Sequence, residues 1–453
     1  MLSHQDNERL VRVGPGTPMG TLMRAYWIPF LPSADLERDG TPVRVRLLGE
    51  DLVAFRDTQG RVGLVDHACP HRAAPMVFGR NEEGGLRCVY HGWKFAYDGS
   101  ILDTPAEPEG SLLRKHLKIP SYPCVERMGV VWTWMGPADR EPPPLPDFEW
   151  NMVPAENRVL TFRIQECNWL QALEGEIDSA HAPVLHGRID GQGEINGWIA
   201  ARNLRPSFHC LTQPFGLSIA SRRELDEHSA YWRVNQFLMP FFTLVPPQAK
   251  YSELSGHAWV PIDDENTLAI MFSYHPSQPM YPRSREVMEN GHAGRETGHA
   301  SVNAFEPDNP MQPFAKYRTR FRRDNGYRFD PELQRTAFFS GLPGLWVQDA
   351  ACQSGVDRIV DRTKEHLGVT DTGIQKTRRL LLDHLKTLEA SGALPAGVDD
   401  AQTTMVRAVS ITLTADTDWA TACAEIMRAK PGQDFGYDLS DQPKSAPTTE
   451  AGA

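Results

Sequence analysis

The chain has 453 residues, of which 40% are hydrophobic, and this predicts two or three packed cores in a two-domain globular protein. Its formal net charge of −11 argues against nucleic acid or an anionic membrane as partner and favours a small substrate or another protein. Seven Cys in so long a chain do not suggest a disulfide framework. Without a secretory signal or a run of about 20 apolar residues, we expect a cytoplasmic protein.

The first third of the chain has the pattern of a β-rich domain. Residues 40–65 alternate apolar and polar positions around Gly-containing turns and predict three short strands. A further strand is predicted within RMGVVWTWMG (127–136), and the proline-rich PADREPPPLPDF (137–148) predicts an extended linker. We therefore expect an all-β domain with an N-terminal segment over residues 1–150.

The second region, residues 151–440, mixes strand and helix patterns. A strand pattern in RVLTFRIQECNW (158–169) leads into helical spacing over LQALEGEIDSAHAPVLHG (170–187), and long strand candidates follow between residues 217 and 275. A helix is predicted at 371–392, whereas residues 283–310 are expected to form a long mobile loop and 441–453 a disordered tail. Together, these strand and helix patterns predict an α+β domain with a curved antiparallel sheet and helices on one side.

Two mixed Cys/His pairs stand in CPHRAAPMVFGRNEEGGLRCVYHGWKF (69–95). Cys69 and His71 are separated by sixteen residues from Cys88 and His91. Four such ligands suit zinc or a [2Fe–2S] centre, and mixed pairs favour the Rieske geometry, in which each loop gives one Cys to one iron and one His to the other. The cluster alone does not establish catalysis, because electron carriers use it too.

This segment resembles the Rieske motif of the ring-hydroxylating and demethylating oxygenases, and the resemblance extends over roughly residues 10–390. It implies an all-β Rieske [2Fe–2S] domain followed by an α+β helix-grip (START-like) catalytic domain with a curved antiparallel sheet. It also implies one [2Fe–2S] cluster and one mononuclear Fe(II) per chain. NAD(P)H would act through a separate flavin/iron–sulfur reductase, since the chain has no Gly-rich dinucleotide fingerprint.

The segment DSAHAPVLHG (178–187) offers Asp178, His181 and His186 for a metal. Non-haem Fe(II) sites use two His and one carboxylate. On a regular helix the two His would point about 140° apart, but Pro183 should kink or restart the helix and turn His186 toward His181. The segment resembles the family's Asp-x-x-His-x-x-x-x-His motif, which implies two iron ligands and, in Asp178, the catalytic acidic residue that links one subunit's Rieske centre to the next subunit's iron.

The last iron ligand in the family is an Asp at a point comparable to Asp349, in GLPGLWVQDAACQSG (341–355), with Asp357 and Asp361 as rivals. Segments 167–187 and 361–382 resemble more narrowly the phthalate dioxygenase branch, which also contains aryl-ether O-demethylases. A substrate carboxylate would need a partly buried Arg. The candidates, which the sequence does not rank, are Arg205, Arg222, Arg223 and Arg233.

We therefore expect a terminal oxygenase that uses O2 and reductase-supplied electrons to hydroxylate an aromatic carboxylic acid, with phthalate-like cis-dihydroxylation favoured. O-demethylation of a methoxylated aromatic acid is the alternative within the class. The rivals from other classes are a Rieske electron carrier without its own catalytic iron and a zinc-binding interaction module. The family's electron route implies a head-to-tail homotrimer, or a stacked hexamer of two such rings.

Overall fold

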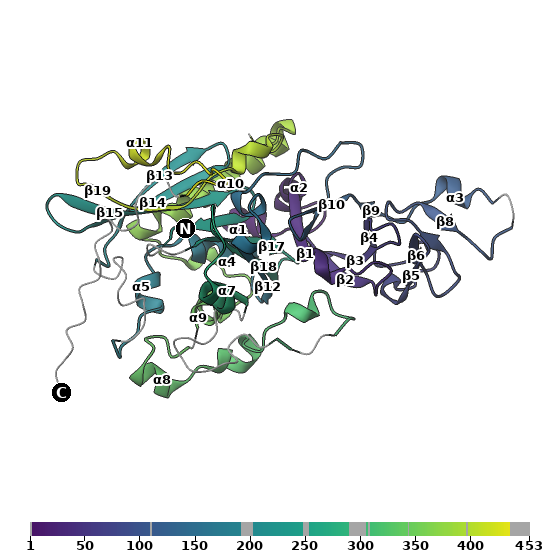
Figure 1. Ribbon diagram of the computed structural model, residues 1–453, viewed down its shortest axis with the longest axis horizontal. Coiled ribbons are helices and arrows are strands. Elements are labelled where there is room, and N and C mark those ends of the chain that lie inside the picture. Colours follow the sequence, from purple (N-terminus) through teal and green to yellow (C-terminus); the bar gives the residue numbers. More distant parts are fainter. Residues whose placement is uncertain are drawn as a thin grey trace.

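The computed structural model describes residues 2–108, 111–191, 203–247, 253–289, 305–306, 309–342, 344–395 and 397–434. The molecule is elongated, with the N-terminal β sheets at one end and a larger α+β region at the other (Figure 1). No helix among the described residues is long and apolar enough to cross a membrane. The predicted tail, 441–453, lies outside the described residues.

Two short helices, α1 (His4–Val11) and α2 (Pro18–Arg24), precede the first strand. Side-chain oxygens cap the N-termini of both helices: Ser3 accepts a hydrogen bond from the backbone N–H of Asp6, and Thr17 accepts one from that of Gly20. Both helices pack against α10 (Thr372–Ser391), near the other end of the chain. The N-terminal segment therefore belongs structurally to the α+β region.

Three small antiparallel sheets form the β region. Their strands are β1 (Trp27–Pro32), β10 (Cys124–Arg127) and β11 (Val130–Trp134); β2 (Val43–Leu47), β3 (Glu50–Arg56), β4 (Val62–Asp66) and β9 (Ser121–Tyr122); and β5 (Arg80–Glu82), β6 (Gly85–Arg87), β7 (Lys94–Phe95) and β8 (Ile101–Asp103). Among the described residues between these strands, the one α-helix is α3 (Leu113–His116). Strands β2 to β4 and β11 confirm the predicted strands.

The α+β region is built on an eight-stranded antiparallel sheet with the order β12-β18-β17-β16-β15-β14-β13, and β19 pairs with β15. These strands are β12 (Arg158–Gln165), β13 (Ser207–Gln213), β14 (Gly216–Glu224), β15 (Ser229–Leu238), β16 (Phe242–Val245), β17 (Leu254–Pro261), β18 (Thr267–Tyr274) and β19 (Val409–Thr414). The predicted α+β class with an antiparallel sheet is confirmed.

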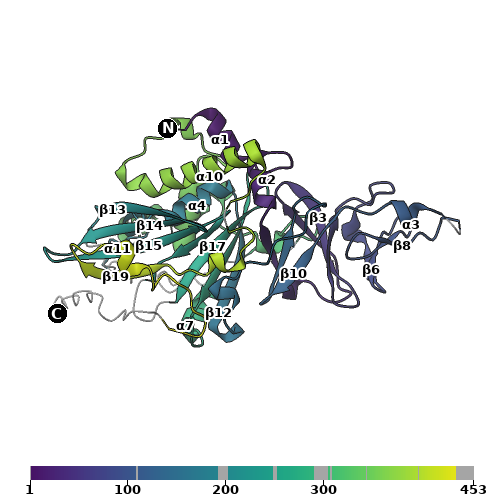
Figure 2. The same cartoon turned by 90° about the horizontal axis from the view of Figure 1, so that it is seen from above.

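The helices of this region lie on both faces of the sheet (Figure 2), which corrects the predicted arrangement with helices on one side. The remaining α-helices of the described residues are α4 (Trp169–Ile177), α5 (Ala182–Leu185), α7 (Pro282–Glu289), α8 (Pro331–Thr336), α9 (Leu345–Ser354) and α11 (Trp419–Cys423). Helix α7 corrects the expected loop over 283–310, because a helical turn satisfies the backbone there; residues 290–304 lie outside the described ranges. Short 3₁₀ segments occur at Ser33–Asp35, Met76–Phe78, Glu149–Asn151, Ala155–Asn157, Ala315–Tyr317, Arg323–Arg328, Arg362–Lys364, Val369–Asp371 and Ala401–Thr404.

One face of the large sheet carries a row of polar side chains beneath helices α4 and α10. Directly paired residues of neighbouring strands share a face, and so do residues two apart on one strand. By this rule the register groups Arg163, Met271, His257, Thr243, Asn235, Arg233 and Ser221 on one face. Figure 2 shows α4 and α10 on one side of the sheet and α11 on the other. The polar row is therefore covered by helices.

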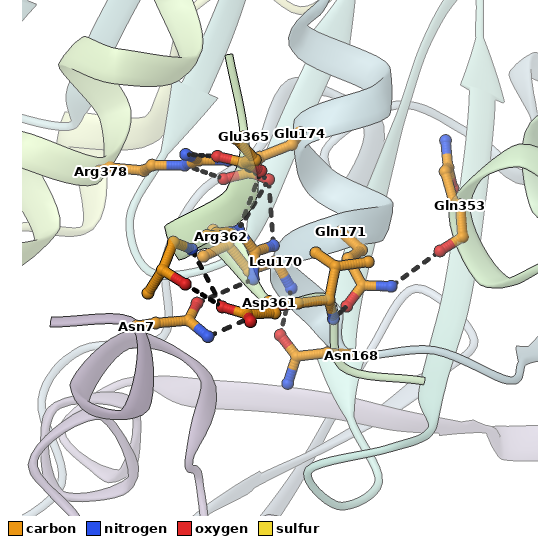
Figure 3. A network of polar contacts seen from close by, with 12 residues as sticks. Asn7, Asn168, Leu170, Gln171, Glu174, Gln353, Asp361, Arg362, Glu365 and Arg378 are labelled. Atoms are coloured by element: carbon orange, nitrogen blue, oxygen red, sulfur yellow. Dashed lines mark hydrogen bonds and ion pairs between the residues drawn. The ribbon is translucent and has the colours of Figure 1, made fainter. Parts of the chain in front are cut away.

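A buried network of charges anchors α4 (Figure 3). Glu174 of α4 accepts hydrogen bonds from Arg362 at 3.0 Å and from Arg378 of α10 at 2.6 Å. Arg378 also pairs with Glu365, and Arg362 donates to the side chain of Asn7 on α1. These contacts tie three helices together around Glu174. They fix the axis of α4, whose last residue stands one position before Asp178.

Candidate metal centres

The first candidate centre is formed by two similar loops that each present a Cys and a His. In the loop after β4, the Cys69 N–H donates to the Ala74 carbonyl at 2.9 Å and the Ala73 N–H donates to the Cys69 carbonyl at 2.8 Å. In the loop after β6, the Cys88 N–H donates to Trp93, and the N–H of Gly92 donates back to Cys88. Gly92 has a φ of +77° with the Pro105 ring close by, a position that only glycine suits.

The structure brings the four predicted ligands of this centre together. Cys69 and Cys88 are 2% and 3% exposed, and the rings of His71 and His91 have centroids 4.4 Å apart. His71 stacks on Trp93 at 4.7 Å, which fixes the plane of its ring. The Cys side chains lie on the buried side of the loops, whereas the two imidazoles are half-buried.

The donor set fits a [2Fe–2S] cluster. Burial, with a smaller contribution from the neighbouring Cys88, raises the pKa of the Cys69 thiol to about 11. The buried Nδ1 of His71 has no hydrogen-bond partner among the described residues. Two adjacent buried sulfurs and an unpartnered imidazole nitrogen are what a cluster bound by two Cys and two His would use.

The second candidate centre consists of His181, His186 and Asp349. One potential ligand atom from each lies within 4.8 Å of the others. The Nε2 atoms of His181 and His186 approach the same Oδ1 of Asp349, at 3.4 and 3.5 Å. Two imidazoles and one carboxylate on one side of a common point can hold a non-haem metal with positions left open for other ligands.

The chain around Pro183 explains why the two His converge. Helix α4 ends at Ile177, and a separate helix, α5 (Ala182–Leu185), begins with Pro183 in its first turn. His181 and His186 stand immediately before and after this short helix, with ring centroids 5.3 Å apart. The predicted restart of the helix is confirmed. The break falls earlier than Pro183, because the chain already leaves α4 at Asp178.

Each histidine has a hydrogen-bond partner on the nitrogen that faces away from Asp349. His186 Nδ1 lies 2.7 Å from the amide oxygen of Gln348, whose NH2 donates to the Leu342 carbonyl. Nδ1 of His186 therefore carries the proton and Nε2 stays free for a metal. His181 Nδ1 lies 3.2 Å from Oδ2 of Asp178, a carboxylate that only accepts, so the same tautomer follows.

Burial and the neighbouring charges shift the pKa of all three residues of this centre. Burial lowers the pKa of His181, but Asp178 and Asp349 outweigh it and raise that pKa to about 10. Burial lowers the pKa of His186. For Asp349, burial alone would raise the pKa, and the two His together bring it below its usual value. A dication at this point would replace the proton of His181.

The other acidic candidates lie in different surroundings. Asp178 follows α4 and accepts the Ala180 N–H at 2.7 Å, and its side chain is 20% exposed. Asp361 starts the 3₁₀ segment Arg362–Lys364 and pairs with Lys364 at 3.1 Å. Asp357 is exposed and lies 4.0 Å from Arg323. Neither rival joins the His pair, so Asp349 is the carboxylate that the fold brings to it.

The four candidate arginines differ in their exposure and in their hydrogen-bond partners. Arg205 is exposed, and Arg222 pairs with Glu224 at 2.8 Å. Arg223 is fully buried, but its Nη2 donates to the Ser179 carbonyl at 2.8 Å and its Nε to Asn203. Arg233 is 6% exposed, and its Nη1 has no hydrogen-bond partner among the described residues.

Sequence reasoning missed three residues of this region: Gln348, Glu176 and Arg163. Glu176 of α4 accepts hydrogen bonds from His257 at 2.6 Å and from Trp259 at 3.1 Å. The sequence position of Gln348, next to Asp349, is only a weak sign of a functional role. Arg163 gives a clearer sign, because it is a charged residue in the middle of a strand whose other face carries Phe162 and Ile164.

The chain matches two protein families. Residues 26–123 match the Rieske [2Fe-2S] domain, and residues 133–441 match the LigXa C-terminal domain like family. The chain is 38% identical over 424 residues to the 3-chlorobenzoate-3,4-dioxygenase oxygenase subunit of Comamonas testosteroni, covering 92% of this chain and 97% of that protein. It is 34% identical over 435 residues to the phthalate 4,5-dioxygenase oxygenase subunit of Pseudomonas putida, covering 92% and 94%.

A further protein is similar in sequence, and two solved structures are similar in fold. The 5,5'-dehydrodivanillate O-demethylase oxygenase subunit of Sphingobium sp. is 30% identical over 407 residues, covering 86% of this chain and 81% of that protein. Among solved structures, dicamba monooxygenase bound to dicamba has a TM-score of 0.55 at 17% identity, covering 82% and 99%. The reduced oxygenase–ferredoxin complex of carbazole 1,9a-dioxygenase has a TM-score of 0.53 at 17% identity, covering 86% and 98%.

The fold and the family matches together define a Rieske oxygenase. The chain belongs to the Rieske non-haem iron aromatic ring-hydroxylating oxygenases, as a terminal oxygenase subunit of the phthalate dioxygenase-like branch. Its N-terminal β region is a Rieske [2Fe–2S] domain, and its α+β region is the catalytic domain of that family.

Proposed function

We propose that this subunit cis-dihydroxylates an aromatic carboxylic acid, with O2 as oxidant and electrons from a separate reductase. The observation that carries the proposal is the convergence of His181, His186 and Asp349 beside the helix-covered polar face of the sheet. The 3-chlorobenzoate and phthalate dioxygenase relatives cover over nine-tenths of the chain and support an acid substrate. O-demethylation of a methoxylated acid is the alternative, supported by the 30% identical O-demethylase.

The proposal assigns the four residues Cys69, His71, Cys88 and His91 to the [2Fe–2S] cluster, and His181, His186 and Asp349 to a mononuclear Fe(II). Iron at the second site would supply the activation of O2. The protein's own contribution is geometric: Gln348 fixes the tautomer of His186, and Asp178 fixes that of His181.

Asp178 has a second proposed role, at a contact between subunits. The Rieske loops near β6 and the short helix α5 lie far apart in the molecule (Figure 1), so the cluster that approaches Asp178 is proposed to come from a neighbouring copy. The partly exposed carboxylate of Asp178 suits a hydrogen bond from a cluster-ligating His of that copy. A head-to-tail homotrimer, or a stacked hexamer, would repeat this contact around a closed ring.

The electron donor is proposed to be a flavin/iron–sulfur reductase that oxidises NAD(P)H. The likeness to the oxygenase–ferredoxin complexes of carbazole 1,9a-dioxygenase supports docking of an iron–sulfur protein. Exposed Val89 and Tyr90, next to His91, provide an apolar contact surface at the Rieske loops for such a donor.

Product analysis with a compatible reductase tests the function. The purified subunit is supplied with 3-chlorobenzoate, the phthalate isomers and the methoxybenzoates, and the products are examined for cis-diols and for formaldehyde. We expect a cis-diol from a chlorobenzoate or a phthalate isomer. Formaldehyde from a methoxybenzoate, without any diol, would replace the proposal by O-demethylation. Oxidation of the reduced cluster with no oxygenated product from any acid would favour the electron-carrier alternative.

A further inference from the structure

Arg163 is a buried cation without an anionic partner among the described residues. It lies in the middle of β12 and is 3% exposed. Its Nε has no hydrogen-bond partner among the described residues, and its Nη2 reaches only the thioether sulfur of Met271, at 3.6 Å. No carboxylate of the described chain lies within 4.0 Å of its guanidinium, whereas buried cations are normally paired.

The position of Arg163 relates it to the second metal centre. Its guanidinium lies 5.0 Å from the ring centroid of Trp346, on α9. Asp349 stands one turn further along the same helix, and residues three apart on a helix share a side. The carboxylates of Asp349 and Glu176 both act electrostatically on Arg163. Burial nevertheless lowers the pKa of Arg163 to about 10, so its charge is poorly compensated.

The two nearby carboxylates are already engaged. Glu176 accepts hydrogen bonds from His257 and Trp259, and Asp349 faces the Nε2 atoms of the two His. The Nε–H and Nη2–H groups of Arg163 form the guanidinium edge that can bind both oxygens of an added carboxylate. Met271, which contacts this edge through its flexible thioether, can move aside for such a ligand.

We infer that Arg163 binds the carboxylate of the aromatic substrate, an inference that rests on the function proposed above. The planar guanidinium, held against Trp346, would receive the carboxylate, and the aromatic ring would then lie toward His181, His186 and Asp349. Arg163 is thus a specificity-determining residue, which selects acids over neutral aromatics of the same shape.

Two other buried arginines of the same sheet, Arg223 and Arg233, are less suited to this role. The donors of Arg223 are used by Ser179, Ser221 and Asn203. Arg233 has an unpartnered Nη1, but it lies close enough to the buried Arg223 for its charge to act on that residue. The charge of Asp349 acts on Arg163, whereas the carboxylate that acts on Arg223 is that of Asp178.

The test is calorimetric binding to the purified oxygenase, which needs no turnover. The probes are 3-chlorobenzoate and phthalate, each with its neutral methyl ester, and the variants are Arg163→Met, Arg163→Lys and, as the rival, Arg233→Met. We expect Arg163→Met to weaken binding of the acid by roughly 30-fold or more and to change ester binding by less than about threefold. Arg163→Lys should recover part of the loss, because it restores the charge without the bidentate edge.

Cluster absorbance and iron content, unchanged in Arg163→Met, establish that the variant is folded. Undiminished acid binding by Arg163→Met, equal weakening of acid and ester, or loss of acid binding in Arg233→Met instead would each overturn the inference. In those cases wild-type binding of the acid still supports the proposed function. A wild-type protein that binds neither acid would overturn the proposed acid substrate itself.

Discussion

His186 donates its Nδ1 proton to the amide oxygen of Gln348, at 2.7 Å, and Gln348 is the residue directly before Asp349. Helix α9 therefore supplies both a candidate metal ligand and the group that orients another ligand. Because the amide is held by its own bond to the Leu342 carbonyl, the orientation of His186 is set before any metal binds.

Replacing Gln348 by Leu should remove this orientation. We expect affinity for Fe(II) at the second centre to fall about 10- to 100-fold, with the Rieske spectrum unchanged, because the Nδ1 proton of buried His186 loses its acceptor. Competition against a chelator measures the affinity. Cys352→Ala, an exposed position on the same helix, serves as the control and should bind iron as the wild type does. Equal iron affinity in Gln348→Leu and Cys352→Ala would show that Gln348 does not orient His186 for iron binding.

Asp178→Ala should separate metal binding from turnover. With Fe(II) in excess both metal centres should stay filled, whereas steady-state oxygenation should fall by roughly 100-fold or more because the link between subunits is lost. Single-turnover oxidation of the prereduced cluster should slow in parallel. Full activity in this variant would refute the bridging role.

Metal binding at the second centre should release one proton. The raised pKa of His181, about 10, means that this imidazole is protonated at neutral pH in the metal-free protein, whereas the lowered pKa values of His186 and Asp349 leave both ready to bind. The apparent Kd for Fe(II) should therefore fall about tenfold for each unit of pH rise between roughly pH 7 and 9. Anaerobic titrations measure this slope. If the Kd for Fe(II) does not change with pH, the metal does not displace a proton from His181.

The buried Glu174 network should contribute strongly to stability. Glu174→Gln leaves the charges of Arg362 and Arg378 undercompensated, and we expect a loss of about 3–5 kcal/mol in the free energy of unfolding at neutral pH. Burial alone would raise the pKa of Glu174, but the two Arg lower it on balance. Glu174 therefore contributes its full share to the free energy of unfolding above its pKa in the unfolded chain, which is about 4.3. This share disappears as the pH falls through the lower pKa of Glu174 in the folded protein.

Urea unfolding of both proteins at several pH values measures this difference, which should narrow below about pH 4. Asp383→Asn, which breaks the exposed pair with Arg379 on α10, is the matched control and should cost less than about 1 kcal/mol. A Glu174→Gln protein as stable as Asp383→Asn at neutral pH would show that the network does not anchor α4.

The local features of this protein could be predicted from its sequence. Both Rieske loops fall within residues 69–95, so the spacing of their ligands indicated a Rieske cluster, whereas the roles of Asp178, His181 and His186 were implied by the resemblance to the family's motif. The role of Pro183 also followed from local backbone rules, because a helix that restarts at a proline changes direction.

The long-range features could not be predicted with the same certainty. Asp349 reaches the His pair because α9 packs beside α4, and without this packing the choice of Asp349 over its rivals Asp357 and Asp361 rested on the family resemblance. Arg163 was overlooked because alternation in β12 predicts that its polar face meets solvent. Here helices cover that face, so its polar residues line the catalytic region instead of the surface.

The central claim is that this chain holds its own iron at His181, His186 and Asp349 in addition to the cluster. Iron analysis of the purified wild type beside Asp349→Ala tests it most directly. We predict three iron atoms per chain in the wild type, two of them in the cluster, and two in the variant with an unchanged Rieske spectrum. Two iron atoms in both proteins, or three in both, would contradict the claim.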